Sequence, residues 1–522
     1  MSERFDSDQM LDELIGEALP ELPPDDIARE VTPWRKSMGR VLTGLVLVTV
    51  QFNFLLLQYI LPAAGVILML LGYRQLRREN KWFRLGYVLS WITMLRTFAS
   101  LIINTTIYSG KLTGAAIGAD ALRDPLMLAS LTVSVLSYAA FYKGFRAVQD
   151  KAGAEDHSAL TLLMVWYAAL LVLALIGFQG LVIGIIIVAL YAVVIKGVIA
   201  LTDELDAAGY CIRPAPVRIA DSHLTIALLA VLAAGMICGG VFFSRYPMQW
   251  EPAGGPAQTN AADAASQAQT EEIRARLVEL GLPEALAADL DDETLLAMDD
   301  ASEVITVKEH GVPLKAQTQT DTRNAWGDYY TYTPWGPPSP AVSCANYAVR
   351  RGDGENWMLI YSFRWPDEKA LYGTAMMRTD IDEWMWTLTG TYGRVLYDKA
   401  GESYSAPMYS INTDLPMFTQ QWRTSAEFSL PRKAAGRRGY MAFEIEPSAY
   451  LLNDLSESSG ENRGLDYRYI IDSYCTYRFQ TGALVYPMRK ASAEVGWFAA
   501  MGEEEGGFFT FQDVLQAKIQ KE

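Results

Sequence analysis

The chain has few of the residues that carry most enzyme chemistry. Three histidines and four cysteines occur among its 522 residues. No pair of them has the spacing of a zinc site, and no G-x-S-x-G motif offers a nucleophilic serine on a sharp turn. The sequence therefore predicts no metal, no cofactor and no catalytic residue. It favours a non-enzymatic protein and leaves an enzyme open.

Clustered basic residues of the kind that bind nucleic acid are also missing. The formal net charge is −16, and phosphate recognition requires a concentrated basic face. The acid gathers at the N-terminus, where residues 1–34 hold ten acidic residues against Arg4 and Arg29. A cleavable signal peptide would begin with a basic region, so we expect the first apolar stretch to serve as the insertion signal.

What the chain does have is a series of long apolar runs between residues 41 and 243. A helix that crosses the ~30 Å hydrocarbon core needs about 20 apolar residues, with roughly 17 as the short limit. On this criterion residues 39–244 form a transmembrane bundle of seven spans. The first two spans fit only as a tight hairpin, and one long helix followed by a re-entrant stub is the alternative. The expected spans are 40–57, 59–74, 85–107, 125–142, 159–177, 180–200 and 223–243.

The loop charges predict an orientation. Basic clusters precede span one, follow spans two and four, and separate spans six and seven, whereas the opposite loops carry little net charge. Cytoplasmic loops are enriched in Lys and Arg, so the N-terminus is expected inside and residues beyond span seven outside. We expect a multi-pass protein of a bacterial cytoplasmic (plasma) membrane, with the lipid bilayer as its first partner.

One charged side chain lies deep in a predicted span. Arg96 falls midway through span three, where a charge costs about 2.5–3.5 kcal/mol on insertion scales. No Asp or Glu lies in any predicted span to pair with it. Either Arg96 contacts an anionic substrate, as in a transporter, or carbonyls, hydroxyls and water satisfy it. Its candidate partners are Asn104, Gln51, Asn53, Gln58, Ser130, Thr132 and Ser134.

The N-terminal segment, residues 1–38, is predicted to be an acidic cytoplasmic tail. Within residues 7–19 an apolar stripe that includes Leu11, Leu14 and Ile15 lies opposite acidic residues, as on an amphipathic helix. So short a helix is not stable alone in water. It either folds on a cytoplasmic protein partner or belongs to a disordered solubilising tail.

Beyond the spans the composition changes twice. Residues 245–270 are mostly Ala, Gly, Gln and Pro, which predicts a linker. Residues 271–300 predict a small helical module, in which Gly281 ends one helix, Pro283 opens the next, and Asp291 or Asp292 caps a third.

Residues 301–522 are rich in short β-branched and aromatic segments separated by turns. Such a pattern predicts an all-β antiparallel sandwich or jelly-roll-like domain. His310, the one histidine of this domain, is expected in a loop, and residues 512–520 are expected to form a closing helix. Cys344 and Cys475 are either bridged across the sandwich or free.

Aromatic residues give the clearest hint of a ligand site. Trp384 and Trp386 alternate, which predicts that they share one face of a strand. With Asp382 and Arg378 beside them, they would suit a sugar or a peptide, although aromatic rings more often fill a core. A cluster of acids (Asp380, Asp382 and Glu383) would serve a hydrolase, but such clusters are usually solvated turns.

Together these patterns predict an integral membrane protein that presents a β-sandwich outside the cell. The leading hypothesis is a non-enzymatic sensor, binding or envelope-assembly protein coupled to a cytoplasmic partner through residues 7–19. Its ligand outside would be an envelope glycan, a peptide or a protein. A transporter or transporter accessory that uses Arg96 is the alternative.

Overall fold

The computed structural model has two compact units. The first comprises Met1–Asn104 and Tyr108–Gly239, and the second comprises Thr105–Ile107 and Gly240–Glu522. Within them the structure describes residues 33–50, 56–109, 125–153, 158–176, 180–210, 212, 215, 217–253, 261–314, 322–323, 329–330, 340–352, 356–414, 421–449, 470–483, 485–493 and 501–518. The predicted tail helix at residues 7–19 lies outside these ranges.

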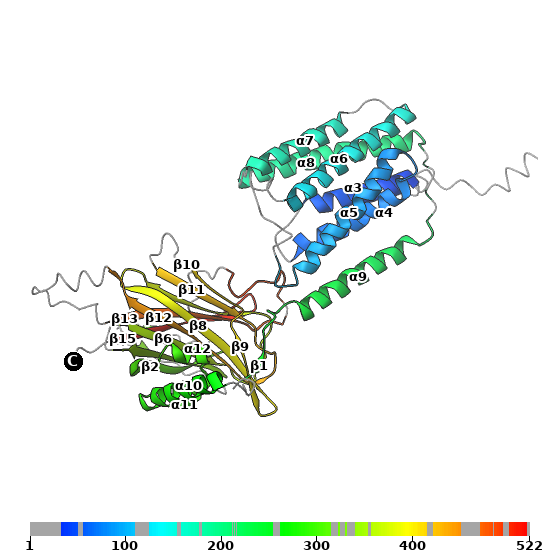
Figure 1. Ribbon diagram of the computed structural model, residues 1–522. Helices are drawn as coiled ribbons and strands as arrows, with labels where there is room; N and C mark the ends of the chain where they lie inside the picture. Colours follow the sequence, from blue (N-terminus) through cyan, green and yellow to red (C-terminus); the bar gives the residue numbers. More distant parts are fainter. Residues whose placement is uncertain are drawn as a thin grey trace, which may run out of the picture. The chain divides into compact units, whose positions relative to one another are not determined.

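Helices make up the first unit (Figure 1). Among the described residues, six of them are long and apolar enough to cross a membrane, which indicates a multi-pass membrane protein. They are α4 to α9, so the prediction of seven spans is corrected to six. The helices are α3 (Pro33–Thr49), α4 (Leu57–Leu76), α5 (Lys81–Ile103), α6 (Pro125–Ala152), α7 (Ala159–Ile176), α8 (Leu181–Ala207) and α9 (Asp221–Phe242).

The helix that fails the criterion is α3, with 17 residues. Its first half carries Arg35, Lys36 and Arg40, so its apolar part is confined to residues 41–49. At 1.5 Å per residue this part is about 14 Å long, less than half of the hydrocarbon thickness. The prediction placed this span seven residues too late in the chain because sequence hydropathy runs on past Thr49, where the helix ends.

Close glycine contacts pack α3 against α4 as an antiparallel pair. A Cβ atom placed on Gly44 would lie 2.5 Å from the carbonyl oxygen of Gly65, and one on Gly72 would lie 2.7 Å from the carbonyl oxygen of Ser37. Small residues allow helix backbones to approach this closely inside a membrane. Residues 40–74 therefore form two helices rather than one long helix.

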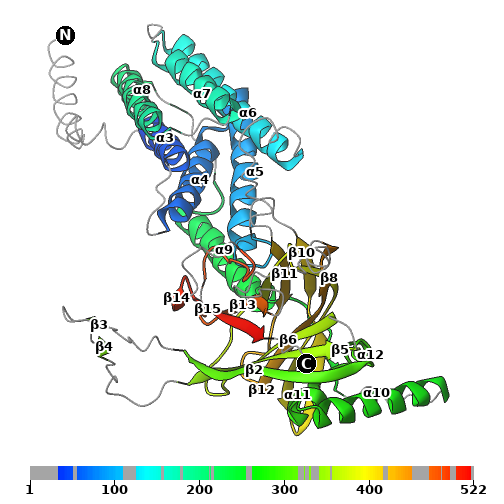
Figure 2. The same cartoon turned by 90° about the vertical axis from the view of Figure 1, so that its left-hand side faces the viewer.

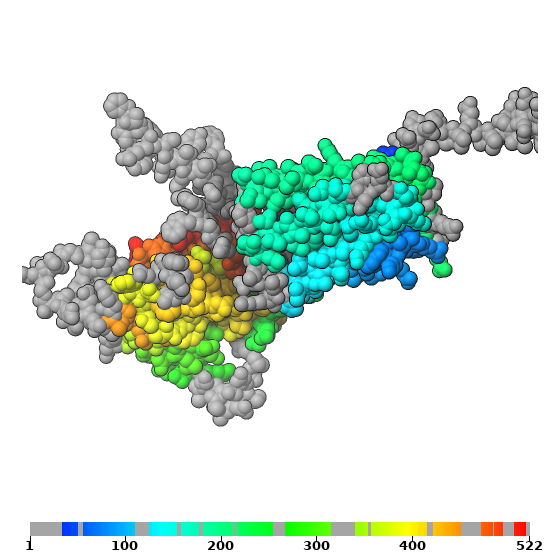
Figure 3. Space-filling model, turned by 90° about the horizontal axis from the view of Figure 1, so that it is seen from above, coloured from blue at the N-terminus to red at the C-terminus, as the bar shows by residue number. Residues whose placement is uncertain are grey.

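The outer surface of the first unit is strongly apolar. Figure 3 shows one face of this unit, with α6, α7 and α8 coloured cyan to green. In α7 and α8 only 22% and 17% of the most apolar window is buried. Isolated water-soluble units rarely expose apolar surface on this scale, so these faces are suited to lipid. Large exposed side chains here include Leu162, Val165, Val172, Ile185, Ile186 and Val193.

One end of the helical unit holds a network of ion pairs around Asp221, the first residue of α9. Its carboxylate accepts hydrogen bonds from Arg40 of α3 (2.5 Å), Arg74 of α4 (3.2 Å) and Gln75 of α4 (3.0 Å). Gln75 in turn accepts a hydrogen bond from Ser37 (2.5 Å). The start of α3, the end of α4 and the start of α9 therefore meet at one end of the unit, which we call the basic end.

Further polar contacts bring other helix ends to the basic end. Glu79, which follows α4, accepts hydrogen bonds from Lys151 near the end of α6 and from Tyr210 after α8, both at 2.5 Å. Asn80 caps α5 by accepting from the Phe83 backbone N–H, and its amide donates to the Gly144 carbonyl of α6. These are helix ends where the sequence places its basic clusters.

The second unit is built on two antiparallel sheets (Figure 2). The first sheet has seven strands in the order β1-β9-β8-β12-β6-β5-β2, and the second has six in the order β10-β11-β7-β13-β15-β14. The strands of the first sheet are β1 (Glu251–Pro252), β2 (Ala301–Pro313), β5 (Ala341–Arg351), β6 (Asn356–Arg364), β8 (Trp386–Lys399), β9 (Glu402–Pro407) and β12 (Ala435–Pro447). Those of the second are β7 (Ala375–Asp382), β10 (Ser410–Asp414), β11 (Gln421–Phe428), β13 (Ile470–Gln480), β14 (Met501–Glu505) and β15 (Phe508–Lys518), and β3 (Thr322–Arg323) pairs with β4 (Tyr329–Tyr330).

The two sheets enclose an aromatic core, which confirms the predicted two-sheet antiparallel architecture. Alternate residues of each strand point inward, as on β6, where Trp357, Leu359, Tyr361 and Phe363 are all buried in this core. Rings from the second sheet, including Phe479, pack against Phe363 at 5.0 Å between centroids.

A helical layer covers the opposite face of the first sheet. It consists of α10 (Ala261–Glu279), α11 (Glu284–Asp289) and α12 (Asp292–Leu296). Leu277 and Leu295 of this layer share a buried cluster with Tyr347, Ile360 and Ala442 of the sheet. The three helices lie where the sequence places its helical module, although α10 already begins within the stretch predicted as a linker. Gly281 closes α10 with a φ of +114°, as expected.

Two local predictions in the second unit are wrong. Residues 512–520 form no helix in their described part, because β15 continues to Lys518 and pairs along β13. Buried Asp513, Leu515 and Ala517 alternate with outward residues there, which is the two-residue period of a strand. His310 lies within β2 rather than in a loop, paired with Cys344 of β5.

Replacing Asp221 tests the network at the basic end. Asp221→Asn leaves Arg74, whose side chain is 8% exposed, without a counter-ion, so we expect the unfolding free energy to fall by about 2–4 kcal/mol. The matched control is Asp203→Asn, because Asp203 and Arg35 form a half-exposed pair worth at most about 1 kcal/mol. Thermal unfolding in detergent measures both. Equal losses in the two variants would show that the network contributes no special stability.

Candidate functional site

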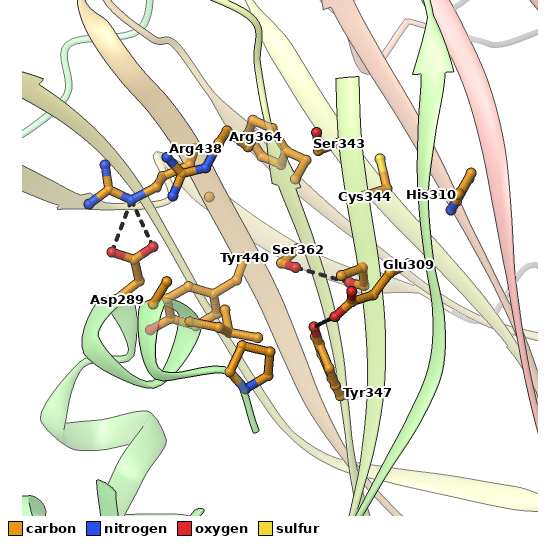
Figure 4. Close-up of a pocket in the computed structure, with 16 residues that line it drawn as sticks. Asp289, Glu309, His310, Ser343, Cys344, Tyr347, Ser362, Arg364, Arg438 and Tyr440 are labelled. Atoms are coloured by element: carbon orange, nitrogen blue, oxygen red, sulfur yellow. Dashed lines mark hydrogen bonds and ion pairs between the residues drawn. The ribbon is translucent and has the colours of Figure 1, made fainter. Parts of the chain in front are cut away.

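A cavity lies between α11 and the outer face of the first sheet in the second unit. Its volume is about 480 Å³, which falls within the ~300–1,000 Å³ of small-molecule sites. Figure 4 shows its lining, with one wall from α11 and a floor from strands β2, β5, β6 and β12. The cavity therefore exists only because the helical layer docks on the sheet.

The floor residues share one face because strand side chains alternate. Ser343, Ala345 and Tyr347 project from β5, and their register partners on β6 and β12 complete the face. Ser362 on β6 donates a hydrogen bond to the Ala345 carbonyl at 3.0 Å. Beside these polar groups the cavity has an apolar side, formed by Pro283, Ala285, Leu286 and the Tyr440 ring.

Arg438 of β12 is fully engaged within the fold. Its Nε atom donates to both carboxylate oxygens of Asp289 on α11, at 3.0 and 2.7 Å, and its Nη1 atom donates to Asp398 at 2.9 Å. Burial lowers the pKa of Arg438, but the two carboxylates outweigh it and leave the pKa raised. This arginine anchors α11 to the sheet and adds no free charge to the cavity.

Arg364 of β6 is different. It is exposed, and no hydrogen bond or ion pair joins it to any residue among those that the structure describes. Its register partners are Arg438 on one side and Ser343 on the other. Asp398 feels its charge, because Arg364 is one of several groups that lower the pKa of that carboxyl against the effect of burial. Arg438, its register partner, is already bound to Asp289 and Asp398, so within the described residues Arg364 feels the field of Asp398 but forms no ion pair of its own.

A carboxylate lies across the floor from this arginine. Glu309 of β2 accepts a hydrogen bond from the Tyr347 hydroxyl at 2.6 Å, and burial together with this carboxylate raises the pKa of Tyr347. Within the described ranges Glu309 forms no ion pair. Among the described residues, the cavity floor thus carries one cation and one anion that form no ion pair.

A second polar cluster lies at the edge of the two sheets, around buried Asp513. Lys308 lies 3.0 Å and His310 3.6 Å from its Oδ1 atom, and Asn346 donates to Oδ2 at 2.8 Å. Burial lowers the pKa of His310 and raises that of the neighbouring Cys344 thiol. A thiol whose pKa is raised by burial is a poor nucleophile. Lys308, His310 and Asn346 of the first sheet all contact Asp513 of the second, so this cluster joins the two sheets.

The two cysteines of the second unit are both free and buried. Cys344 lies on β5 and Cys475 on β13, in different sheets. Of the two alternatives left open by the sequence, a bridge or two free thiols, the structure therefore has the free thiols. Among the described side chains, no group of three His, Cys, Asp or Glu residues is placed to hold a metal ion.

The tryptophans singled out in the sequence do not share a strand face. Trp384 lies in the turn between β7 and β8 and is 45% exposed, while Trp386 begins β8 and is buried in the core. The prediction of a shared face is wrong because Asp382 ends β7 and accepts the Trp384 backbone N–H at 2.9 Å, which starts the turn. Arg378 pairs with Asp380 at 3.4 Å. None of these residues lines the α11 cavity.

The polar residues expected inside the bilayer are separated. Arg96 lies on the exposed surface of α5 and donates a hydrogen bond to Ser130 of α6, one of its expected partners. Asn104 is buried at the end of α5, where its backbone N–H bonds to the Ser100 carbonyl. Leu11, Leu14 and Ile15 lie outside the described residues.

Sequence reasoning missed Arg364 and Glu309. The only local signal was alternation, because Ser362 and Arg364 are the polar members of the segment Ser362–Trp365. Such a pattern marks one solvent-facing side of a strand. It could not reveal that α11 would stand over that side and turn it into a cavity.

No protein-family model and no curated protein sequence matches this chain.

Docking of the helical layer depends on Asp291, which caps α12 by accepting from the Thr294 backbone N–H (3.1 Å) and also binds Tyr440 and Arg394 of the sheet. We expect Asp291→Ala to lower the unfolding free energy by about 2–3 kcal/mol at pH 7. Asp299→Ala, at a nearby exposed position, is the control.

The difference in unfolding free energy between the original protein and Asp291→Ala should depend on pH. Burial raises the pKa of Asp291, but bonds from Thr294, Arg394 and Tyr440 outweigh it and lower the pKa. A lowered pKa stabilises the fold above the unfolded value of about 4, and the gain is lost as the pH falls through the folded value. The stability difference between the original protein and Asp291→Ala should therefore shrink below about pH 4. A constant difference from pH 7 to pH 3 in denaturant titrations would contradict this.

Proposed function

We propose that this protein is a membrane-anchored binding protein that takes up a small ligand in the α11 cavity of its second unit, outside the cell. The observation that carries the proposal is the cavity itself, which combines an apolar side with unpaired Arg364 and Glu309 on its floor. Small-molecule sites likewise set a few polar groups that orient the ligand against apolar walls, although polar residues are the majority in this lining.

The orientation rests on the arrangement of helix ends. Because α3 and α4 pair antiparallel, the chain enters and leaves this pair at the basic end. This holds however far into the membrane the connection between the two helices reaches. Of the six candidate spans, α4 belongs to this pair, so five net crossings, α5 to α9, remain. An odd number of crossings puts the second unit on the side opposite the basic end. Basic loops favour the cytoplasm, so the second unit lies outside and the N-terminal tail inside.

This arrangement also suits a sensor or an envelope-assembly protein. Helix α9 begins at Asp221 in the network of the basic end and leads directly into the second unit. A ligand that changes the second unit would act on this helix. The cytoplasmic partner is proposed to bind the amphipathic stripe of residues 7–19, a role that rests on the sequence alone. If the coupling is real, deleting residues 1–32 should abolish signalling while insertion stays normal.

A transporter is the weaker candidate. Arg96 would have to line a pathway through the helices, but its guanidinium lies on the exposed surface of α5 with Ser130 as its partner. An exposed arginine of this kind is satisfied by a hydroxyl and by lipid headgroups or water.

Blocking the cavity tests the binding proposal. Ala285 is exposed and lines the cavity, so Ala285→Trp should fill it without disturbing the core. Ala288→Trp, at an exposed position of the same helix outside the lining, is the matched control. The melting temperature of the full-length protein in detergent is measured against envelope glycans, cell-wall peptides and neutral sugars.

A ligand that binds only the folded state at about 100 times its Kd stabilises it by about 2.7 kcal/mol. We expect at least one ligand class to raise the melting temperature of the original protein and of Ala288→Trp, and to leave Ala285→Trp unchanged. A response that survives in Ala285→Trp, or no response to any class, would refute the cavity as the binding site.

A further inference from the structure

We infer that the ligand of the α11 cavity is a short zwitterionic peptide, with its carboxylate bound by Arg364 and its ammonium group bound by Glu309. This inference rests on the proposed binding function and adds the chemical class of the ligand. It follows from the charges that the floor leaves unpaired and from the distance between them.

The strand register fixes that distance. Arg364 of β6 is paired with Ser343, and Glu309 of β2 is paired with Ala345, so both flank β5 from opposite sides with an offset of two residues. Two strand spacings of about 4.8 Å and a rise of about 3.4 Å per residue place their Cα atoms about 12 Å apart. The Tyr347–Glu309 hydrogen bond places Glu309 on the same face as the cavity floor.

The separation selects the length of the ligand. If the Arg364 and Glu309 side chains stand above the sheet, their charged groups are also about 12 Å apart. A hydrogen bond of about 2.8 Å from each of them to the ligand then leaves about 6–12 Å between the ligand's own charged groups, depending on the direction of these bonds. An extended peptide covers about 3.3–3.6 Å per residue. Two or three residues therefore span the gap between the two charges.

The surface between the two charges fits a peptide backbone. The Ser362 hydroxyl already donates its proton to the Ala345 carbonyl, so its oxygen is left to accept a peptide N–H. Arg438 and Asp289 form an ion pair with each other, so the ligand needs no third charged group to balance them. A neutral sugar would leave Arg364 and Glu309 without counter-ions, and a simple anion would satisfy only Arg364.

A set of capped peptides tests the inference on the full-length protein in detergent. Isothermal titration compares Ala-Ala and Ala-Ala-Ala with their N-acetylated forms, their C-terminal amides and their doubly capped forms. Hydrogen bonds to charged groups contribute enough that each single cap should weaken binding about tenfold or more. Equal affinity for free and capped peptides would overturn the inference.

Two variants test which side chain binds which end of the peptide. Arg364→Gln should remove the difference between the free acid and the amide while keeping the effect of N-acetylation, and Glu309→Gln should do the reverse. Lys433→Gln and Glu446→Gln are controls that make the same charge changes at exposed positions outside the lining, and both should behave as the original protein. Arg364→Lys, which keeps the charge, should retain part of the preference. Melting curves confirm that each variant is folded.

The outcomes distinguish failure of the zwitterionic-peptide inference from failure of the proposed binding function. If a neutral glycan binds and Ala285→Trp abolishes this binding while the peptides fail to bind, the cavity is a binding site and the zwitterion inference is wrong. If neither the peptides nor the wider panel binds, the proposed function fails as well. Peptide binding that persists in Ala285→Trp would move the peptide site elsewhere and overturn the inference.

Discussion

The carboxylate of Asp221 holds the ends of three helices together, and the arrangement of the helical unit depends on this junction. Arg40, Arg74 and Gln75 all donate to it, so the start of α3, the end of α4 and the start of α9 lie at one end of the helical unit. In the orientation that we propose, the antiparallel pair α3 and α4 leaves five net crossings, α5 to α9, before the second unit, and basic loops favour the cytoplasm. The proposed place of the second unit outside the membrane rests on this arrangement.

The second unit turns a common sandwich into a binding surface by adding a third layer. Arg438 and Asp291 connect α11 and α12 to the first sheet through charged hydrogen bonds. Because their charged groups make these bonds, they are not available to bind a ligand. Arg364 and Glu309, one on each side of β5, keep their charges. The polar groups that stabilise the layer are thus distinct from those offered to a ligand, so the site can be altered without undoing the fold.

Much of this architecture could be read from the sequence, because it depends on local periodicity. Apolar length predicted the membrane helices, alternation predicted the two antiparallel sheets, and Gly281 and Asp291 marked the helical module. Errors arose where tertiary contacts decide. Sequence hydropathy does not stop at Thr49, where α3 ends. The residues of β15 form a strand because they pair with β13. The expected face of Trp384 and Trp386 is lost because Asp382 turns the chain before Trp384. The candidate site was missed because residues about 80 positions apart along the chain, on α11 and β6, make it together.

Labelling from one side of the membrane tests the central claim most directly. In a background without the native cysteines, Lys433→Cys in the second unit and Arg78→Cys in the loop after α4 each provide one thiol for a membrane-impermeant maleimide. The account predicts that intact cells label Lys433→Cys at once and Arg78→Cys only after permeabilisation. Labelling of both sites, or of neither, in intact cells would place them on the same side and contradict the odd number of crossings. The reverse pattern would place the cavity in the cytoplasm.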